Sequence, residues 1–520
     1  MPYKRKSILA GTLILTAASV FTRVLGFVYR IYMSKALGAE GMGLYQLIIP
    51  VYGLCWSVTC SGITTTVSKL VAAENIRKEY GNMGRVLKQS LVLTCSLALI
   101  VAAALFFFAE PISVYFLRDA RTALSLRLIA LSVPFMAAGS CIRGYFFGLQ
   151  ESLKPAVSQV LEQCVRMAVV FLLAGAFIPR GLEFACAAAV AGMAAGEILS
   201  FVYILFSYRR FKSRRGLIKK PTKRGGETLA LIISMSLPLT LNRVSGSLLG
   251  TLESLLIPQK LEQFGMTKVA AVSLFGRING MAMPLIYFPS ALLTSLSVAL
   301  VPAVSEAAAR GGNARISATV SKSMMFASII GAFACMVFLV MPGELGEIIY
   351  NQDIGGLLFM LGTLCPVLYI NMTLSGILNG LGQQLFIFKN SVLSYIITIG
   401  GVYFLVPVYG APAFIAGWFA SLLLAAILSV TKIKKITGIK LRPVKWFVKP
   451  AISALAVGLT IKHIKTLVPA MGSLPGLFVT LAALGLAYFG LMLALGGIKF
   501  SEIRQLYARF VPGPADKELG

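Results

Sequence analysis

The sequence predicts an all-α, polytopic membrane protein. Of its 520 residues, 57% are hydrophobic and only 13% are charged, whereas soluble proteins are about 45–50% apolar and about 25% charged. So few charged side chains cannot cover the surface of a soluble chain of this length. The mean hydropathy of +0.83 and the 49 glycines agree, because glycine is commoner in membrane helices than in soluble ones.

Apolar stretches long enough to cross a bilayer follow one another along almost the whole chain. A span needs about 20 mostly apolar residues, and this window predicts fourteen transmembrane helices. The first follows a basic start like a signal peptide, but arginines stand where a cleavage site belongs, so we expect a retained helix. The expected spans are 7–32, 41–66, 88–109, 122–148, 155–178, 182–208, 227–257, 269–304, 318–342, 354–381, 387–407, 411–431, 446–466 and 474–497.

A basic connection, 209–226, divides these spans into two lobes. Residues 1–208 are expected to form an N-terminal lobe of helices 1–6, and residues 227–431 a C-terminal lobe of helices 7–12. Helices 13 and 14 follow in 432–497, and 498–520 is expected to be a cytoplasmic tail. No connection reaches the size of a soluble catalytic domain, so we do not expect an enzyme.

The formal net charge of +29 is explained by membrane topology. An even number of spans places both termini on one side, and most lysines and arginines fall in the segments of that side. Cytoplasmic loops carry such an excess, so both termini are expected in the cytoplasm. The basic connection is expected to contact anionic membrane lipids, and no nucleic-acid partner is predicted.

Neither a metal site nor a cofactor site is predicted. The eight cysteines all lie in apolar segments without a Cys-x-x-Cys motif, and the single histidine, His463, has no second ligand near it in sequence. This pattern is typical of buried, unreactive thiols. A phosphate-binding loop of the Gly-x-x-x-x-Gly-Lys-[Ser/Thr] type is absent from the sequence, so no ATP site is expected.

Three arginines inside the expected spans are candidates for a binding site. A charge within the bilayer costs about 2.5–3.5 kcal/mol on insertion scales, so such residues commonly mark function. Arg23 and Arg30 are two helical turns apart and project from nearly the same face. Together with Arg277 they predict a cavity for an anionic ligand, because guanidinium holds phosphate oxygens bidentately. The alternative for each is anchoring at the membrane interface.

The other arginines within the spans are expected to be structural. Glu162 precedes Arg166 by one helical turn, a spacing that forms an ion pair. Arg127, Arg143 and Arg243 lie near helix ends or polar neighbours, so we expect interface anchors there.

Glu253 is a carboxylate inside a span with no partner nearby in the sequence. An intramembrane glutamate is by default a candidate for proton or cation coupling. The alternative is a buried ion pair with one of the arginines.

Two stretches of the sequence resemble a known family. They are Arg23-Val24-Leu25-Gly26, Arg30 and 37–45 near the N-terminus, and Leu274-Phe275-Gly276-Arg277 with 297–306 further along. They resemble the stage V sporulation protein B family, a polysaccharide-transporter branch of the multidrug/oligosaccharidyl-lipid/polysaccharide exporter superfamily. The lipid II flippases belong to the same superfamily.

The resemblance implies two six-helix lobes around a central cavity, with helices 13 and 14 beside them, in the bacterial cytoplasmic membrane. It implies a flippase that moves an undecaprenyl-diphosphate-linked glycan, lipid II or a related peptidoglycan or spore-cortex precursor, from the inner to the outer leaflet. Alternating access would be driven by membrane potential or by a Na⁺ or H⁺ gradient. Cell-wall synthesis enzymes are further expected partners.

The resemblance also assigns roles to residues. Arg23, Arg30 and Arg277 match the cavity arginines that hold the diphosphate. Glu253 falls where lipid II flippases place an acidic residue associated with a sodium site, and Asn390 and Ser394 fall near its partners. One departure is that 51–55 offers no cation where the lipid II flippases have a further arginine on helix 2.

Several other functions stay open from the sequence. The cargo of the transporter could be another lipid-linked polysaccharide repeat unit. A drug or cation antiporter of the same superfamily is a second alternative, although such cavities favour acidic and aromatic residues. From other classes, a membrane glycosyltransferase or a non-transporting scaffold for cell-wall enzymes are the alternatives.

Overall fold

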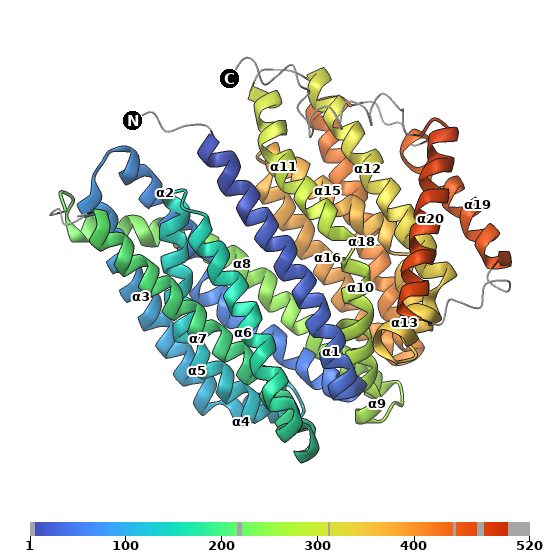
Figure 1. The fold of residues 1–520 in the computed structure, drawn as a ribbon, viewed down its shortest axis with the longest axis horizontal. Helices are drawn as coiled ribbons and strands as arrows, with labels where there is room; N and C mark the ends of the chain where they lie inside the picture. Colours follow the sequence, from blue (N-terminus) through green and yellow to red (C-terminus); the bar gives the residue numbers. More distant parts are fainter. Residues whose placement is uncertain (1–5, 216–220, 310–312, 440–443, 465–472, 498–520) are drawn as a thin grey trace. The chain divides into compact units, whose positions relative to one another are not determined.

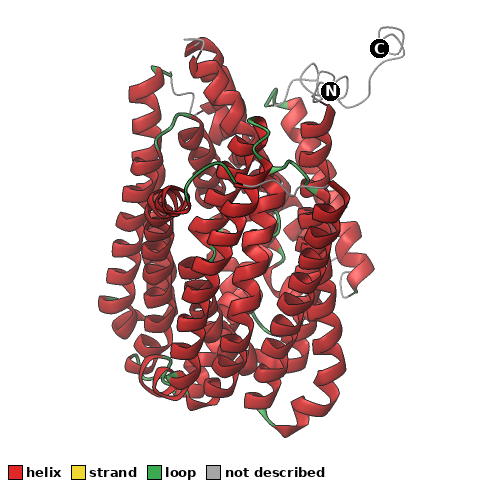
Figure 2. Cartoon of the chain, turned by 90° about the vertical axis from the view of Figure 1, so that its left-hand side faces the viewer, coloured by secondary structure: helices red, strands yellow, loops and turns green. Residues whose placement is uncertain are grey.

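The computed structural model of this chain describes residues 6–215, 221–309, 313–439, 444–464 and 473–497. Over these residues it consists of helices and connecting loops, without strands (Figure 2). The all-α prediction is therefore confirmed, and the chain is a multi-pass membrane protein. The predicted tail 498–520 and part of the predicted linker 209–226 lie outside the described residues.

Packing divides the chain into two units. The first unit comprises Met1–Met281 with Tyr395–Phe414, and the second comprises Ala282–Ser394 with Ile415–Gly520. This division reflects which residues pack together in one conformation, whereas the predicted lobes are parts that move relative to each other. The predicted lobe boundaries at 208, 227 and 431 therefore stay predictions.

The first unit is built from long helices joined by short connections. In this unit α5 packs against α3 and against α7, and α7 packs in turn against α6 (Figure 1). Its helices are α1 (Lys6–Thr59), α2 (Ser61–Ile76), α3 (Tyr80–Phe107), α4 (Ala109–Pro111), η1 (Ile112–Phe116), η2 (Ala120–Thr122), α5 (Ala123–Gly148), α6 (Leu153–Phe177), η3 (Ile178–Arg180), α7 (Leu182–Arg215), α8 (Gly225–Gln263), α9 (Lys268–Gly276), most of η4 (Arg277–Ala282), the second half of α16 (Gln384–Phe404) and α17 (Val406–Tyr409).

The second unit contains shorter and more bent helices. α14 and α15 meet at a bend of 50°. The helices of this unit are α10 (Met283–Tyr287), α11 (Ser290–Ala309), α12 (Asn313–Val340), α13 (Pro342–Tyr350), α14 (Gly355–Gly362), α15 (Cys365–Gly380), the first half of α16, most of α18 (Ala411–Thr437), η5 (Val444–Val448), α19 (Lys449–Ile464) and α20 (Leu474–Ala494).

Fourteen spans are not confirmed. Counted over the described residues, 11 helices are long and apolar enough to cross a membrane, or up to 12 if α14 and α15 form one span. The first two predicted spans fall in one continuous apolar stretch, Ala17–Ile76. The predicted span 446–466 corresponds to η5 and α19, which follow each other directly, and its apolar part, Trp446–Thr460, is not among the 11. The count therefore differs at the first two predicted spans, which count as one stretch, and at Trp446–Thr460.

The merged pair is joined through a kink at Gly38. This residue has φ 69° and ψ −173° inside α1, a conformation that glycine adopts readily and other residues rarely do. α1 is helical on both sides of Gly38, so two helices meet at this kink, which falls between the predicted spans 7–32 and 41–66. The kink turns α1 without an intervening loop.

A polar cavity in the first unit

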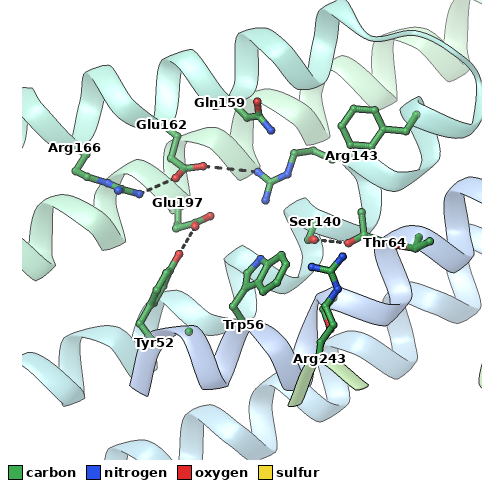
Figure 3. A pocket seen from close by; sticks show the side chains of 14 residues that line it. Tyr52, Trp56, Thr64, Ser140, Arg143, Gln159, Glu162, Arg166, Glu197 and Arg243 are labelled. Atoms are coloured by element: carbon green, nitrogen blue, oxygen red, sulfur yellow. Dashed lines mark hydrogen bonds and ion pairs between the residues drawn. The ribbon is translucent and has the colours of Figure 1, made fainter. Parts of the chain in front are cut away.

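A polar cavity of about 580 Å³ lies within the first unit. Residues of six helices, α1, α2, α5, α6, α7 and α8, form its walls (Figure 3). The lining residues are Tyr52, Gly53, Trp56, Ser61, Thr64, Thr65, Ser140, Arg143, Phe147, Gln159, Glu162, Arg166, Glu197 and Arg243. Polar and charged groups in membrane-spanning helices are costly and usually functional, so this cavity is the candidate site.

Glu162 is held between two arginines. Nη2 of Arg166 donates to Oε1 of Glu162 at 2.8 Å, and Nη1 of Arg143 lies 4.0 Å from Oε2. Nη1 of Arg143 also donates to the hydroxyl of Ser200 at 3.2 Å. The predicted ion pair between Glu162 and Arg166 is confirmed. The weaker Arg143 contact leaves that guanidinium available to another acceptor.

Among the described residues, only one of the two carboxylate oxygens of Glu197 has a hydrogen-bond donor. The hydroxyl of Tyr52 donates to Oε1 of Glu197 at 2.6 Å (Figure 3). The residue is 4% exposed, and its other oxygen, Oε2, has no hydrogen-bond partner among the described residues. A buried carboxylate oxygen without a donor is costly, so a ligand that supplies a donor would complete the site.

Arg243 lies across the cavity beside an aromatic ring. It is exposed, and its guanidinium carbon is 5.9 Å from the ring centroid of Trp56. In the part of the chain that the structure describes, Arg243 forms no ion pair. Its charge is therefore free to meet an anion in the cavity.

Arg143 and Arg243 both line the cavity, a position that the sequence did not predict, and their role as interface anchors stays a prediction. Arg127 fits the prediction better, since its side chain is 46% exposed and lies 3.8 Å from the carboxylate of Glu110.

Small residues beside the charged ones allow the helices to approach closely. A Cβ on Gly196 would lie 2.7 Å from the carbonyl oxygen of Glu162, and a Cβ on Gly144 would lie 2.7 Å from that of Thr64. Glycine at such crossings is typical of membrane helix packing. Each glycine is adjacent in sequence to a cavity residue, Glu197 in one case and Arg143 in the other, so close packing sets the position of the charge.

The three arginines predicted to bind a diphosphate lie elsewhere in the first unit. Arg23 and Arg30 are both exposed on α1. Arg277 is partly buried at the start of the π-helix η4, and its Nε atom has no hydrogen-bond partner among the residues described. Short π-helical segments are frequent at functional sites. A shared site for the three arginines stays a prediction.

Glu253 is partly buried on α8 in the first unit. It forms no ion pair with the described residues, so the alternative of a buried pair with an arginine finds no support. One turn earlier, a Cβ on Gly250 would lie 3.3 Å from the hydroxyl of Tyr395. This close approach brings α16 against the helix that carries Glu253.

Asn390 and Ser394 belong to the second unit. Nδ2 of Asn390 donates to the carbonyl of Ala425 and to the hydroxyl of Ser429, each at 3.1 Å. Its Oδ1 atom is buried with no partner in the described residues. Because Glu253 belongs to the other unit, the ion site that would join these residues stays a prediction.

A second group of charges lies beside the Gly38 kink, at the start of α5. Nη1 of Arg121 donates to Oε1 of Glu40 at 2.7 Å, and Nη2 donates to Oδ2 of Asp119 at 2.8 Å. The ammonium of Lys268 lies 3.7 Å from the same Asp119 oxygen. Burial raises the pKa of Asp119, but the hydrogen bonds and charge of Arg121 outweigh burial and hold that pKa below its ordinary value. The network ties α1 to the connection before α5 and to the first residue of α9.

Comparison with known proteins identifies the family. Residues 8–308, more than half of the chain, match the family described as polysaccharide biosynthesis protein. The chain belongs to this family. Among its relatives, stage V sporulation protein B of Bacillus subtilis (strain 168) is 31% identical over 445 residues, covering 84% of this chain and 86% of the relative. Lipid II flippase MurJ of the same strain is 22% identical over 364 residues, covering 65% and 63%.

Solved structures show the same fold. Lipid II flippase MurJ in an inward closed conformation has a TM-score of 0.69 at 12% identity, covering 92% of this chain and 98% of that one. An inward-facing multidrug resistance MATE family transporter of the MOP superfamily has a TM-score of 0.62 at 15% identity, covering 80% and 94%. The resemblance seen in the sequence is confirmed. The chain therefore shares the fold of these two transporters.

Proposed function

We propose that this protein flips an undecaprenyl-diphosphate-linked glycan, lipid II or a related peptidoglycan or spore-cortex precursor, from the inner to the outer leaflet. The observation that carries the proposal is Arg277, a guanidinium within a membrane-spanning segment whose buried Nε lacks a partner among the described residues. A charge kept in such a place needs a compensating anion when the protein works. The relatives named above support a lipid-linked cargo.

A diphosphate cannot cross the hydrocarbon unaided, because desolvation of its charges costs far more than thermal energy. Arg23, Arg30 and Arg277 would replace water around the diphosphate with bidentate hydrogen bonds. The polyprenyl tail would stay in the lipid while the head group crosses. Arg30 is exposed and has no ion pair in the described part of the chain, which leaves it available for this role.

In this proposal the lobes 1–208 and 227–431 alternate access around the cargo, with helices 13 and 14 in 432–497 beside them. Both termini lie in the cytoplasm, as the distribution of lysine and arginine predicts. A membrane potential that is positive outside favours outward movement of an anion by about 2.3 kcal/mol per charge per 100 mV. A Na⁺ or H⁺ gradient acting at Glu253, with Asn390 and Ser394, is the second source of drive.

The test is replacement of the resident lipid II flippase in a depletion strain. Wild type, Arg277→Ala, Arg30→Ala and Arg127→Ala are compared at matched membrane levels, with lipid II exposure on the outer leaflet as the readout. Arg127 is the control because it is an exposed arginine of the same unit outside the cavity. We expect wild type and Arg127→Ala to restore exposure and the other two variants to fail.

Two results would contradict the proposal. If correctly inserted wild-type protein restores no exposure, lipid II is not the cargo. If Arg277→Ala and Arg30→Ala restore exposure as fully as wild type, these arginines do not hold the diphosphate. Preferential export of a cationic dye by the wild type would favour an antiporter instead.

A further inference from the structure

We propose that the polar cavity of the first unit is a sugar-binding site, and that its ligand is a hexose or hexosamine ring carrying an anionic substituent. The inference rests on the proposed function, because it assigns the glycan part of the cargo to a place separate from Arg23, Arg30 and Arg277. It is carried by three features of the cavity wall: an unsatisfied acceptor, an uncompensated cation and an aromatic face.

The acceptor is Glu197. Its Oε1 is occupied by the hydroxyl of Tyr52 at 2.6 Å, whereas its buried Oε2 has no donor among the described residues. The residue is 4% exposed, so bulk water does not solvate it freely. A hydroxyl or amide N–H of a sugar ring supplies the donor that this oxygen lacks.

The cation is Arg243, supported by Arg143. Arg243 has no carboxylate partner in the described part of the chain, and Arg143 meets Glu162 only at 4.0 Å. Each guanidinium can therefore donate to a carboxylate or phosphate group on the ligand. Charge-assisted hydrogen bonds of this type are about twice as strong as neutral ones.

The aromatic face comes from α1. Tyr52 and Trp56 are one helical turn apart and both line the cavity. The C–H face of a pyranose ring packs against such rings, while its hydroxyls point to the polar edge. The guanidinium of Arg243 lies 5.9 Å from the Trp56 ring, so a sugar on Trp56 would place its substituent within reach of the cation.

The remaining wall suits a polyhydroxylated ligand of this size. The cavity of about 580 Å³ lies within the range of about 300–1,000 Å³ typical of small-molecule sites. Short polar side chains supply further donors and acceptors around it. They are Ser61, Thr64, Thr65, Ser140 and Gln159.

A metal cation fits the cavity less well than this ligand does. Glu162 is already neutralised by Arg166 at 2.8 Å, which leaves one carboxylate, Glu197, without a cationic partner of its own. Arg143 and Arg243, which also line the cavity, would repel a cation. With three guanidinium groups against two carboxylates in the lining, the cavity favours an anion.

The test uses Trp56 as a reporter in the full chain. The protein has three tryptophans, so Trp418→Phe with Trp446→Phe leaves Trp56 as the sole emitter. Thermal unfolding and gel filtration in detergent verify the fold of this background. The probes are N-acetylmuramic acid, N-acetylglucosamine 1-phosphate, neutral N-acetylglucosamine, inorganic phosphate and NaCl.

We expect both anionic sugars to change Trp56 emission saturably, with affinity at least about tenfold tighter than that of the neutral sugar. Arg243→Ala should abolish this difference, and Arg243→Lys should retain part of it. Glu197→Gln should weaken all three sugars by about tenfold. Arg127→Ala, outside the cavity, should change nothing. A response to one anionic sugar alone would show whether the site takes a carboxylate or a phosphate.

Three results would overturn the inference. Inorganic phosphate binding as tightly as the sugar phosphate would make this a plain anion site. A saturable response to NaCl and not to sugars would make it a cation site. Unchanged affinity in both Arg243→Ala and Glu197→Gln would place sugar binding elsewhere.

A flipping assay on the same variants separates this inference from the proposed function. If wild type flips the lipid-linked glycan and Arg243→Ala flips it equally well, the sugar site fails and the flippase stands. If wild type binds the anionic sugars but flips no lipid-linked glycan, the flippase fails and the sugar site stands.

Discussion

Tyr52 and Glu197 lie in different helices, and the tyrosine hydroxyl donates a 2.6 Å hydrogen bond to one oxygen of the buried glutamate. The bond joins α1 to α7 across the wall of the cavity. It also leaves the second glutamate oxygen as an acceptor that no described residue meets. Glu197 therefore has two roles: one oxygen helps to hold α1 against α7, and the other can accept a hydrogen bond from a ligand in the cavity.

Tyr52→Phe should destabilise the protein by about 1–3 kcal/mol, because it removes the only described donor to a buried carboxylate. Thermal unfolding of the purified protein in detergent measures this. Tyr32→Phe is the matched control, since Tyr32 stacks on Phe171 through its ring and this contact survives the substitution. Equal melting temperatures for the two variants would show that the Tyr52 bond contributes nothing.

Gly196→Ala should destabilise the packing of α6 on α7 by about 1–3 kcal/mol. The added Cβ would lie 2.7 Å from the carbonyl oxygen of Glu162, so one helix must move. Gly175→Ala on α6 is the control, because open space surrounds its Cβ position and alanine is the better helix former. The thermal unfolding midpoint should fall for the first variant only. If both behave alike, the close crossing is not a constraint.

The Asp119–Arg121 pair should make the thermal stability of the protein depend on pH. Because the folded-state pKa of Asp119 is held below its ordinary value, the ionised carboxylate contributes stability near neutral pH, and this contribution is lost as pH falls through the folded pKa. Asp119→Asn should therefore unfold at lower temperature than wild type at about pH 7, and the gap should narrow toward about pH 3. A gap that stays constant over this range would contradict the account.

Glu253→Gln should remove the response of transport to an ion gradient and leave movement under membrane potential intact, because the neutral amide cannot exchange a proton or compensate a cation. Initial transport rates in vesicles with an imposed Na⁺ or H⁺ gradient measure this. Glu227→Gln is the control, since Glu227 is exposed at the start of the same helix. Full retention of gradient dependence in Glu253→Gln would exclude this residue from coupling.

The membrane class and the helical fold could be predicted because they follow from composition and span length. The span count could not. Residues 17–76 are apolar enough to count as one stretch, although the helix is broken at Gly38, so the number of spans depends on backbone conformation as well as on hydropathy.

The site was only partly predictable for a similar reason. Glu162 and Arg166 are neighbours on one helix, so their spacing predicts the pair that the structure contains. Tyr52 and Glu197 lie on two helices that are 145 residues apart along the chain. The sequence around either residue therefore does not indicate that they are in contact. The sequence did contain one usable signal, a charged residue next to a glycine within a span: Glu197 follows Gly196, and Arg143 precedes Gly144. A glycine allows two helices to cross closely, and the neighbouring charged side chain then lies between helices.

The most direct test of the central claim is transport by the purified protein in vesicles. A fluorescent undecaprenyl-diphosphate-linked glycan is placed in the inner leaflet, and its appearance in the outer leaflet is followed with a membrane-impermeant quencher under an imposed potential. We predict that wild type moves the label faster than protein-free vesicles and that Arg277→Ala slows it at least about tenfold. A wild-type rate equal to that of protein-free vesicles, under potential and under Na⁺ and H⁺ gradients alike, would contradict the proposal.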